Sequence, residues 1–360
     1  MSILRTRLHK PKIAQNHMPR GSLMDYLGSQ NHTPLKLVVA GAGYGKSVTV
    51  SQWLDQHDCQ HCWISLDRDC NELRLFLNYL TTAVQAIYPT SLRYLHSMLE
   101  SNELPETVVL AGEFINEMAE FNEELNLVLD DYHLIKNQQI HHFIEEVLKF
   151  PLDQLKLFII SRIDPPLRLN TLITYNQVTE LRMANLKFTG PEIQGLARNL
   201  YDLPLDKELS EKIFESTEGW IIGIRFLLKE LAANKALQIP IISSHRGQQN
   251  LVNFLKEEIL LGQQSSSSLQ KLAIQAALFD RFNLELILKI NRKEAEELGV
   301  ETENIGQDFF QFIEQSLFII PLDEDKTWFR FHHLIQETLQ GLVVKHYSKQ
   351  QVRLFYRIGS

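Results

Sequence analysis

The sequence contains little cysteine, no long apolar run and fewer basic than acidic residues. Its three cysteines among 360 residues exclude a disulfide-stabilised scaffold and are typical of a reducing compartment. No run reaches the roughly 18 apolar residues of a membrane-spanning helix, and the N-terminus lacks the apolar core of a secretory signal. The 36 Lys and Arg against 44 Asp and Glu give a net charge of −8, which argues against nucleic acid or an anionic membrane as a direct partner. We therefore expect a cytoplasmic protein that does not bind a membrane.

The cysteines themselves allow two interpretations. Cys59 and Cys62 have C-x-x-C spacing, and His57 and Cys70 are close in the sequence, so a zinc or redox site is one of them. A zinc site needs a second pair of ligands at a suitable spacing, and only Cys70 follows. We therefore favour a loop with incidental thiols that leads into a strand at 62–65.

The pattern of apolar residues predicts an α/β fold. An apolar fraction of 44% is ordinary for a globular protein, and the length suffices for two or three domains. In the first two-thirds of the chain, short apolar runs alternate with segments of helical periodicity, which is typical of a parallel sheet covered by helices on both faces. The predicted strands are Leu37–Ala40, Cys62–Ser65, Leu125–Leu129, Leu155–Ser161 and Val178–Leu181. The predicted helices carry apolar stripes at 76–87 and 140–148, each of which a proline ends.

Beyond about residue 185 the strand signal fades and helices dominate. A capping box at 189–192, with a proline early in the helix, predicts a helix start. A second helix carries apolar residues from Ile221 to Leu231 on one face, and the segment 232–250 is the best linker candidate. We expect another helix to begin at the serine run 265–268.

The C-terminal hundred residues end in a different pattern. Two short strands at 317–322 and 328–331, on either side of the charged turn 323–326, predict a β-hairpin wing. Residues 351–360 keep helical periodicity, so we interpret the chain as a fragment that is cut inside or just after a helix.

The segment 40–47 is the sharpest feature of the sequence. It follows an apolar strand and precedes a helix-competent segment, the context that a phosphate-binding P-loop requires. Its glycines let backbone N–H groups converge on phosphate oxygens, Lys46 would reach the β- and γ-phosphates, and the Ser47 hydroxyl would bind Mg²⁺. The first glycine of the usual pattern G-x-x-x-x-G-K-[ST] is Ala40 here, and a glycine-rich turn without a ligand is the alternative. The predicted nucleotide-binding residues are Ala40, Gly41, Ala42, Gly43, Tyr44, Gly45, Lys46 and Ser47.

A second motif supplies the acidic partner of the P-loop. The apolar strand 125–129 ends in Asp130, which would hold Mg²⁺ through water, and Asp131, which could orient or deprotonate the attacking water. The next strand leads into Arg162. Because the carboxyl ends of parallel strands meet at one edge of a sheet, this arginine would emerge beside Asp130 and act on the γ-phosphate. A surface ion pair with Asp164 is the alternative for Arg162.

Several motifs together resemble the STAND class of P-loop ATPases, in the subfamily of MalT-like transcriptional activators. They run in family order over nearly the whole chain, and their order and spacing make the resemblance specific. The matching strings are Ala42-Gly-Tyr-Gly-Lys-Ser47, Ser51-Gln-Trp53, Trp63-Ile-Ser-Leu-Asp67, Leu129-Asp-Asp-Tyr-His133, Ser161-Arg-Ile-Asp-Pro-Pro166, Leu186-Lys-Phe-Thr189, Thr217-Glu-Gly-Trp220 and Phe329-Arg-Phe-His-His-Leu334.

The resemblance implies a nucleotide switch. Members hold ADP in a closed monomer, an inducer together with ATP opens them to a form that self-associates, and slow hydrolysis resets them. Their domain order is a P-loop domain, a small helical domain, a winged helix, a helical-repeat sensor and a LuxR-type helix-turn-helix. The resemblance therefore implies ATP or ADP and Mg²⁺ as ligands and an unidentified inducer as a partner. It also implies that DNA is contacted only through domains absent from this chain.

The resemblance also assigns individual residues. It implies that the P-loop cradles phosphates, that Asp130 and Asp131 serve Mg²⁺ and water, and that Arg162 is the sensor arginine. His332 matches the winged-helix histidine that touches the ADP β-phosphate in related ATPases, a role that an imidazole donor can perform. For His333 we favour packing.

Two further positions follow from the same resemblance. Arg20 resembles an N-terminal arginine near the nucleotide, with a plain surface residue as the alternative. The family's helical-domain Gly-x-Pro is Gly219-Trp220-Ile221 here, so the proline that packs on the nucleotide is missing.

The sequence thus predicts a P-loop domain of the ASCE/AAA-like type with a parallel sheet at 1–188, a helical lid at 189–240 and a winged-helix-type domain at 241–345. Residues 346–360 would begin a further helical segment. The expected function is an ATP/ADP switch with slow ATP hydrolysis that controls self-association of a transcriptional activator.

Three other functions are alternatives to the switch. An AAA-type ATPase that remodels a macromolecule would turn over fast and form stable rings. A P-loop small-molecule kinase is weaker, because the region after residue 190 shows no cluster of acceptor-binding charges. Direct DNA binding through the winged helix is disfavoured by the net charge of −8 and the acidic turn 323–325.

Overall fold

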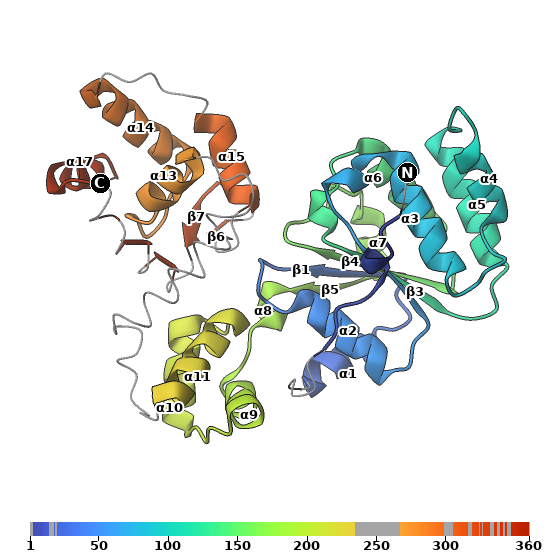
Figure 1. The fold of residues 1–360 in the computed structure, drawn as a ribbon, viewed down its shortest axis with the longest axis horizontal. Helices are drawn as coiled ribbons and strands as arrows, with labels where there is room; N and C mark the ends of the chain where they lie inside the picture. Colours follow the sequence, from blue (N-terminus) through green and yellow to red (C-terminus); the bar gives the residue numbers. More distant parts are fainter. Residues whose placement is uncertain are drawn as a thin grey trace. The chain divides into compact units, whose positions relative to one another are not determined.

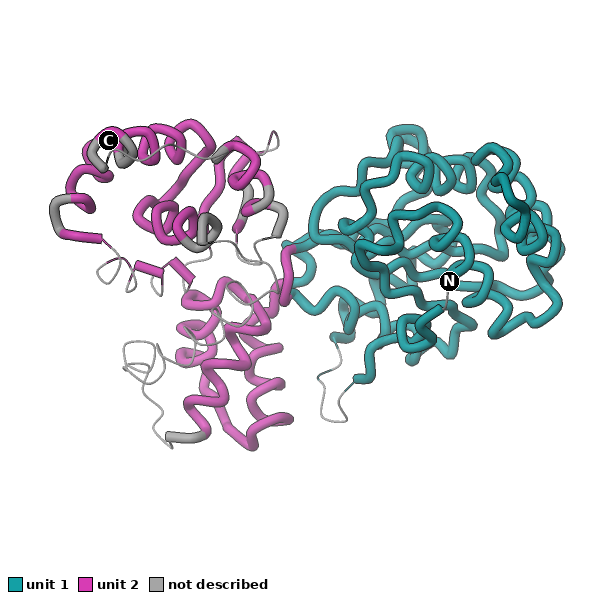
Figure 2. The backbone as a smooth tube through the Cα atoms, turned by 45° about the horizontal axis from the view of Figure 1, so that its top comes forward, with its two compact units in different colours: residues 1–40, 44–186 teal, residues 41–43, 187–360 magenta. Residues whose placement is uncertain are grey.

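The computed structural model of the chain divides into two compact units (Figure 2). Unit 1 holds residues 1–40 and 44–186, and unit 2 holds residues 41–43 and 187–360. The residues that the structure describes are 3–13, 18, 20–234, 267–298, 305–315, 319–323, 325, 327–331, 335–336, 339–340, 343 and 347–359.

Unit 1 is built on a parallel sheet with helices on both faces (Figure 1). Its strands are β1 (Leu35–Val39), β2 (His61–Ser65), β3 (Leu125–Asp130), β4 (Leu155–Ser161) and β5 (Val178–Arg182). They pair in parallel in the order β2-β3-β4-β1-β5. Each predicted strand is confirmed with small shifts at its ends, and β4 lies between β1 and β3. The predicted α/β fold class with a P-loop-type parallel sheet is therefore confirmed.

The helices of unit 1 include three that the sequence patterns predict, among them α2 after the P-loop, and several that they do not. The stripes at 76–87 and 140–148 belong to α3 and α6, whereas α4 and α5 lie in a segment for which no element was predicted. The helical segments are η1 (Arg5–Leu8), α1 (Gly21–Ser29), α2 (Lys46–Gln56), η2 (Arg68–Asn71), α3 (Leu73–Gln85), α4 (Arg93–Glu100), α5 (Thr107–Ala119), η3 (Tyr132–Leu134), α6 (Gln138–Lys149), α7 (Asn170–Thr174) and α8 (Met183–Leu186).

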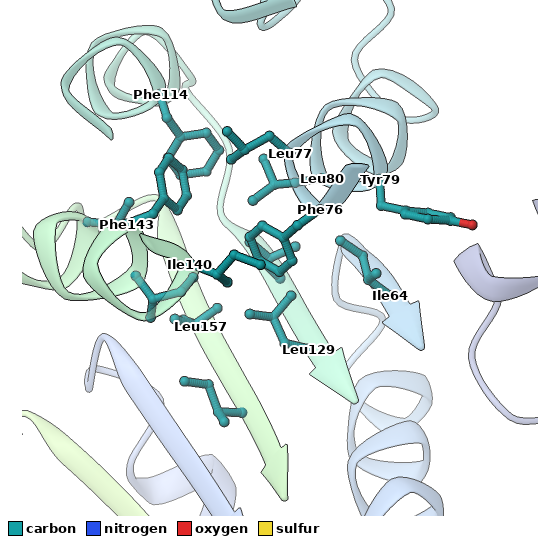
Figure 3. Packing of buried hydrophobic residues seen from close by; sticks show 14 of the residues in the cluster. Ile64, Phe76, Leu77, Tyr79, Leu80, Phe114, Leu129, Ile140, Phe143 and Leu157 are labelled. Carbon is teal, nitrogen blue, oxygen red and sulfur yellow. The ribbon is translucent and has the colours of Figure 1, made fainter. Parts of the chain in front are cut away.

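The main hydrophobic core lies between one face of the sheet and helices α3, α5 and α6. Alternate residues of each strand enter it, so Leu129 of β3 and Leu157 of β4 face the helices (Figure 3). The rings of Phe76, Phe114 and Phe143 fill the space above them. Phe143 lies 6.4 Å from Phe76 and 5.7 Å from Phe114 between ring centroids, and all three rings are buried. This core holds the strands whose carboxyl ends carry the predicted site residues.

Helix α2 is anchored on the opposite face of the sheet. Trp53, near its C-terminus, packs on Phe158 of β4 with ring centroids 5.4 Å apart. The fully buried Lys36 of β1 places its ammonium 5.1 Å from the Phe158 ring and 5.8 Å from the Trp53 ring, and donates to the Thr33 carbonyl oxygen at 3.3 Å. Burial and the neighbouring Lys156 lower the pKa of Lys36 to about 8. The packing fixes the helix that begins at the P-loop lysine.

Unit 2 contains helices and a small hairpin. Its helices are α9 (Gly190–Tyr201), α10 (Lys207–Thr217), α11 (Ile221–Asn234), α13 (Ser267–Ala276), α14 (Leu284–Leu298), α15 (Ile305–Gln315) and α17 (Lys349–Gly359). The predicted capping box is confirmed, because the Thr189 N–H donates to the Glu192 carboxylate at 2.8 Å and α9 follows. Helix α11 takes in residues 232–234, and the rest of the predicted linker lies outside the described residues.

The predicted hairpin wing is also confirmed. Strands β6 (Ile319–Pro321) and β7 (Phe329–Phe331) pair antiparallel, and Asp323 in the turn accepts from the backbone N–H of Thr327 at 2.7 Å. Phe282 forms a bridge with Phe329, with reciprocal backbone hydrogen bonds of 2.8 and 2.9 Å. The bridge ties the hairpin to the segment between α13 and α14.

The segment with Cys59 leads into strand β2, as we favoured. Cys62 is buried in β2, where its thiol donates to the Ala83 carbonyl oxygen at 3.1 Å and burial raises its pKa to about 12. Within the described ranges, His, Cys, Asp and Glu side chains form no group of three or more that could hold a metal ion. No helix in that part of the chain is both long and apolar enough to cross a bilayer.

Candidate phosphate-binding site

The predicted P-loop connects β1 to α2 at the carboxyl edge of the sheet. Gly43 and Gly45 have φ of +74° and +77°, in the left-handed region that glycine adopts without steric cost. Gly45 is the N-cap of α2, which begins at Lys46. The unpaired N–H groups of a helix N-terminus and its positive dipole end both favour an anion there. The loop therefore has the backbone geometry of an anion site.

Lys46 lies among charged groups at this edge of the sheet. The side chain is buried, and burial together with Arg162 lowers its pKa to about 8, while Asp131 and Asp130 act in the opposite direction. An anion at the loop would offset the burial and favour the charged ammonium.

Ser47, in the first turn of α2, is hydrogen-bonded to Asp130 at the end of β3. The Ser47 hydroxyl donates to Asp130 Oδ1 at 3.0 Å, and the same oxygen accepts from the Asp131 backbone N–H at 3.0 Å. Burial and the adjacent Asp131 raise the pKa of Asp130 to about 6. A hydroxyl beside a carboxylate is the oxygen donor set that Mg²⁺ prefers, so these two residues fit the cation that the sequence implied.

Arg162 follows the end of β4, between the strands that lead to the P-loop and to Asp130. Its charge lowers the pKa of both Lys46 and His133, which places it in the same cluster. The alternative partner, Asp164, forms an ion pair with Arg182. The sheet order thus brings Arg162 to the predicted position beside the phosphate loop.

His133 joins the cluster, and the sequence reasoning assigned it no role. It lies in η3, with Nδ1 3.9 Å from Asp131 Oδ1, and its side chain is 7% exposed against 45% for Asp131. Burial, with Arg162, Lys46 and Lys136 nearby, lowers its pKa to about 3, so the imidazole is neutral. The D-D-x-H spacing of the matched string 129–133 was the available signal.

The backbone of Asp131 is strained. Its φ of +58° lies in the left-handed region, which a non-glycine residue adopts at a cost of about 1 kcal/mol or more. Residues held in such conformations cluster at functional sites. Asp131 is the N-cap of η3, the short helix that carries His133.

Arg20 and His332 are the remaining predicted site residues. Arg20 is buried, so it is not a surface residue, and it donates to the carbonyl oxygens of Leu186 at 2.9 Å and Asn185 at 3.3 Å at the end of α8. Its role near a nucleotide stays a prediction. His332 and His333 lie outside the described residues.

Residues 41–43 of the P-loop belong to unit 2. The Trp220 indole N–H donates to the Ala42 carbonyl oxygen at 3.2 Å. A Cβ at Gly43 would lie 2.7 Å from Trp220 Nε1 and 2.4 Å from Ile222 Cδ1, so only glycine fits there. Ile221 stands at the position of the expected proline, and the preceding Trp220 contacts the loop.

Comparisons with known proteins agree with these observations. Residues 256–351 match the family model of the MalT winged helix domain. The HTH-type transcriptional regulator MalT of Vibrio parahaemolyticus is 29% identical over 338 residues, which are 93% of this chain and 36% of that protein. MalT of Yersinia enterocolitica is 28% identical over 347 residues, 94% of this chain and 36% of the relative. The chain thus spans little more than a third of the length of these relatives.

A solved structure shows the same fold. A Walker-type ATPase of Pyrococcus abyssi superposes with a TM-score of 0.55 at 12% identity, over 89% of this chain and 95% of that one. At this identity the likeness concerns the fold alone. Taken with the sequence matches, the chain is MalT-like: it is similar to MalT regulators over most of its own length, and its residues 256–351 match the MalT winged helix domain.

Proposed function

We propose that this chain is the nucleotide-binding switch of a MalT-like transcriptional regulator. The observation that carries the proposal is the cluster at the carboxyl edge of the sheet. There the P-loop with Lys46 and Ser47 lies beside Asp130, with a 3.0 Å hydrogen bond from the Ser47 hydroxyl to the carboxylate. This combination of a helix N-terminus, a buried ammonium and paired oxygen donors suits a nucleoside di- or triphosphate with Mg²⁺.

The cluster divides into binding and hydrolytic groups. The loop N–H groups and Lys46 would bind the β- and γ-phosphates, and the raised pKa of Asp130 would fall when positive charge arrives. Bound Mg²⁺ would supply charge that neutralises the phosphate oxygens. Ser47 and Asp130 are the residues that would hold it.

Hydrolysis would depend on Asp131, His133 and Arg162. The Asp131 carboxylate is half-exposed and can accept a proton or a hydrogen bond from a water molecule, whereas the neutral His133 can orient that water. Arg162 would stabilise charge on the γ-phosphate oxygens. We propose slow turnover that resets the switch.

The wider role follows from the MalT relatives. We propose that the ADP form is a monomer, that ATP and an unidentified inducer produce a self-associating form in the cytoplasm, and that DNA is contacted by other domains. The segments 1–188, 189–240 and 241–345 would be the P-loop domain, the lid and the winged helix. Residues 346–360 would start a helical segment, and His332 would hold ADP.

Analytical ultracentrifugation of the chain with ADP and with ATP tests the switch. We expect a monomer with ADP and, even without the inducer, a measurable shift towards assembly with ATP. Asp131→Asn should keep that shift for longer, because it removes the group that activates water. Lys46→Ala is the matched control and should stay monomeric with both nucleotides. A ring that forms without nucleotide and turns over ATP rapidly would contradict the proposal and favour a remodelling ATPase.

A further inference from the structure

The turn Thr217–Trp220 connects helix α10 to helix α11 in unit 2. It follows α10, and Trp220 at its end contacts Ala42 and the space around Gly43. Ala42 and Gly43 belong to the P-loop, so this turn touches the segment that we propose binds phosphate. Its conformation therefore bears on the shape of that segment.

The turn has an unusual backbone. Glu218 has φ +48° and Gly219 has φ +76°, so two consecutive residues are left-handed. A Cβ on Gly219 would lie 2.8 Å from the Phe188 carbonyl oxygen, and the Phe188 N–H donates to the Gly219 carbonyl oxygen at 2.9 Å. A left-handed glutamate persists only where its surroundings hold it. The strain at Glu218 calls for a partner.

Arg330 of β7 is that partner. Its Nη1 donates to Glu218 Oε1 at 2.8 Å and its Nη2 to Oε2 at 2.6 Å, a bidentate pair between side chains that are 29% and 22% exposed. Lys187 adds a weaker contact, with Nζ 3.9 Å from Glu218 Oε2. Two parallel charge-assisted hydrogen bonds fix orientation as well as distance. The carboxylate of the strained residue is therefore fixed by the hairpin wing.

We propose that the turn Thr217–Trp220 is a positioning element for the phosphate loop, and that the Arg330–Glu218 ion pair sets it from the wing. With the pair intact, Trp220 holds the Ala42 carbonyl and the loop keeps its phosphate-binding shape. When the pair breaks, the left-handed turn loses its external support and the loop binds a nucleotide less tightly. This inference rests on the proposed nucleotide binding and names the residues that couple the wing to it.

The test measures dissociation of mant-ADP from the full chain by stopped-flow fluorescence with excess ADP as the chase. Arg330→Glu and Glu218→Arg should each speed dissociation by roughly fivefold to tenfold, because each leaves like charges facing one another. The double variant Arg330→Glu/Glu218→Arg should restore a rate near that of the wild type, since the opposite charges meet again. Rescue would show that the two charges act on the rate as a pair, and not each by itself.

Two further variants keep the result interpretable. Trp220→Phe keeps a ring beside Gly43 but removes the N–H donated to Ala42, and it should also speed dissociation without disturbing the ion pair. Lys212→Glu breaks an exposed pair with Glu208 on α10 and should leave the rate unchanged.

The outcomes separate the two proposals. If the wild-type chain does not bind mant-ADP, the proposed function is overturned. If it binds and Arg330→Glu releases mant-ADP at the wild-type rate, or the charge swap gives no rescue in a folded protein, this inference alone is overturned. Faster release with rescue supports it.

Discussion

The ionised Asp130 carboxylate should lower the free energy of unfolding of the chain without ligands, although we propose that the same group helps to bind Mg²⁺. The Asp130 carboxyl is buried, and burial together with Asp131 raises its pKa from 3.8 to about 6. A shift of about two units corresponds to ~3 kcal/mol of destabilisation when the group is ionised in the folded protein. Asp130→Asn removes that ionisation and keeps an oxygen that accepts from Ser47 and from the Asp131 N–H. The variant without nucleotide or Mg²⁺ should therefore have a free energy of unfolding ~2–3 kcal/mol above that of the wild type at pH 7.5.

The stabilisation by Asp130→Asn should depend on pH. Because the folded pKa is raised, the destabilisation is fully present above pH 6 and disappears as the pH falls through the folded value towards 3.8. Most of the difference between Asp130→Asn and the wild type should therefore be lost at pH 4. Urea unfolding followed by tryptophan fluorescence checks this, since the buried Trp53 and Trp63 report on unit 1.

A control variant shows whether the effect needs a buried carboxylate or follows from the loss of any negative charge. Asp153 is exposed in the loop before β4, and Asp153→Asn should change the free energy of unfolding little at either pH. A destabilised Asp130→Asn, or a gain that is the same at pH 7.5 and pH 4, would refute the reasoning.

Three further predictions concern the elements that position the site. Phe143→Ala removes a fully buried ring from the main core and should lower the free energy of unfolding by ~3–5 kcal/mol in urea; a loss below ~1 kcal/mol would contradict the packing. Thr189→Ala removes the capping box of α9 and should cost ~1 kcal/mol in thermal unfolding, whereas an unchanged midpoint would not fit the cap. Gly219→Ala places a Cβ 2.8 Å from a carbonyl oxygen at φ +76° and should cost ~1–3 kcal/mol; wild-type stability would show that the turn relaxes freely.

The strands and the P-loop context could be predicted because their signals are local. Each strand is a short apolar run, and the glycines at 43 and 45 mark positions that need a positive φ. The capping box and the hairpin were likewise predicted from contiguous residues. The position of Arg162 needed one topological assumption, the common edge of parallel strands, which the strand order bears out.

The remaining features depend on contacts between distant residues. Helices α4 and α5 are an exception: they were not predicted, although their buried apolar residues recur at helical spacing, at 95 and 99 in α4 and at 110, 114 and 118 in α5. The Glu218–Arg330 pair joins residues that are 112 positions apart, and the contact of Trp220 with Ala42 joins residues 178 positions apart. His133 was present in a matched string, but its burial and its lowered pKa follow from packing that spacing does not reveal.

Isothermal titration of ADP with Mg²⁺ into the chain tests the central claim most directly. The wild type should bind one ADP, and Lys46→Ala should bind at least about tenfold more weakly, because it removes the buried ammonium that faces the phosphates. Lys212→Ala, which changes an exposed lysine on α10, should bind as the wild type does. Equal affinity of Lys46→Ala and the wild type, or the absence of heat from both, would contradict the account.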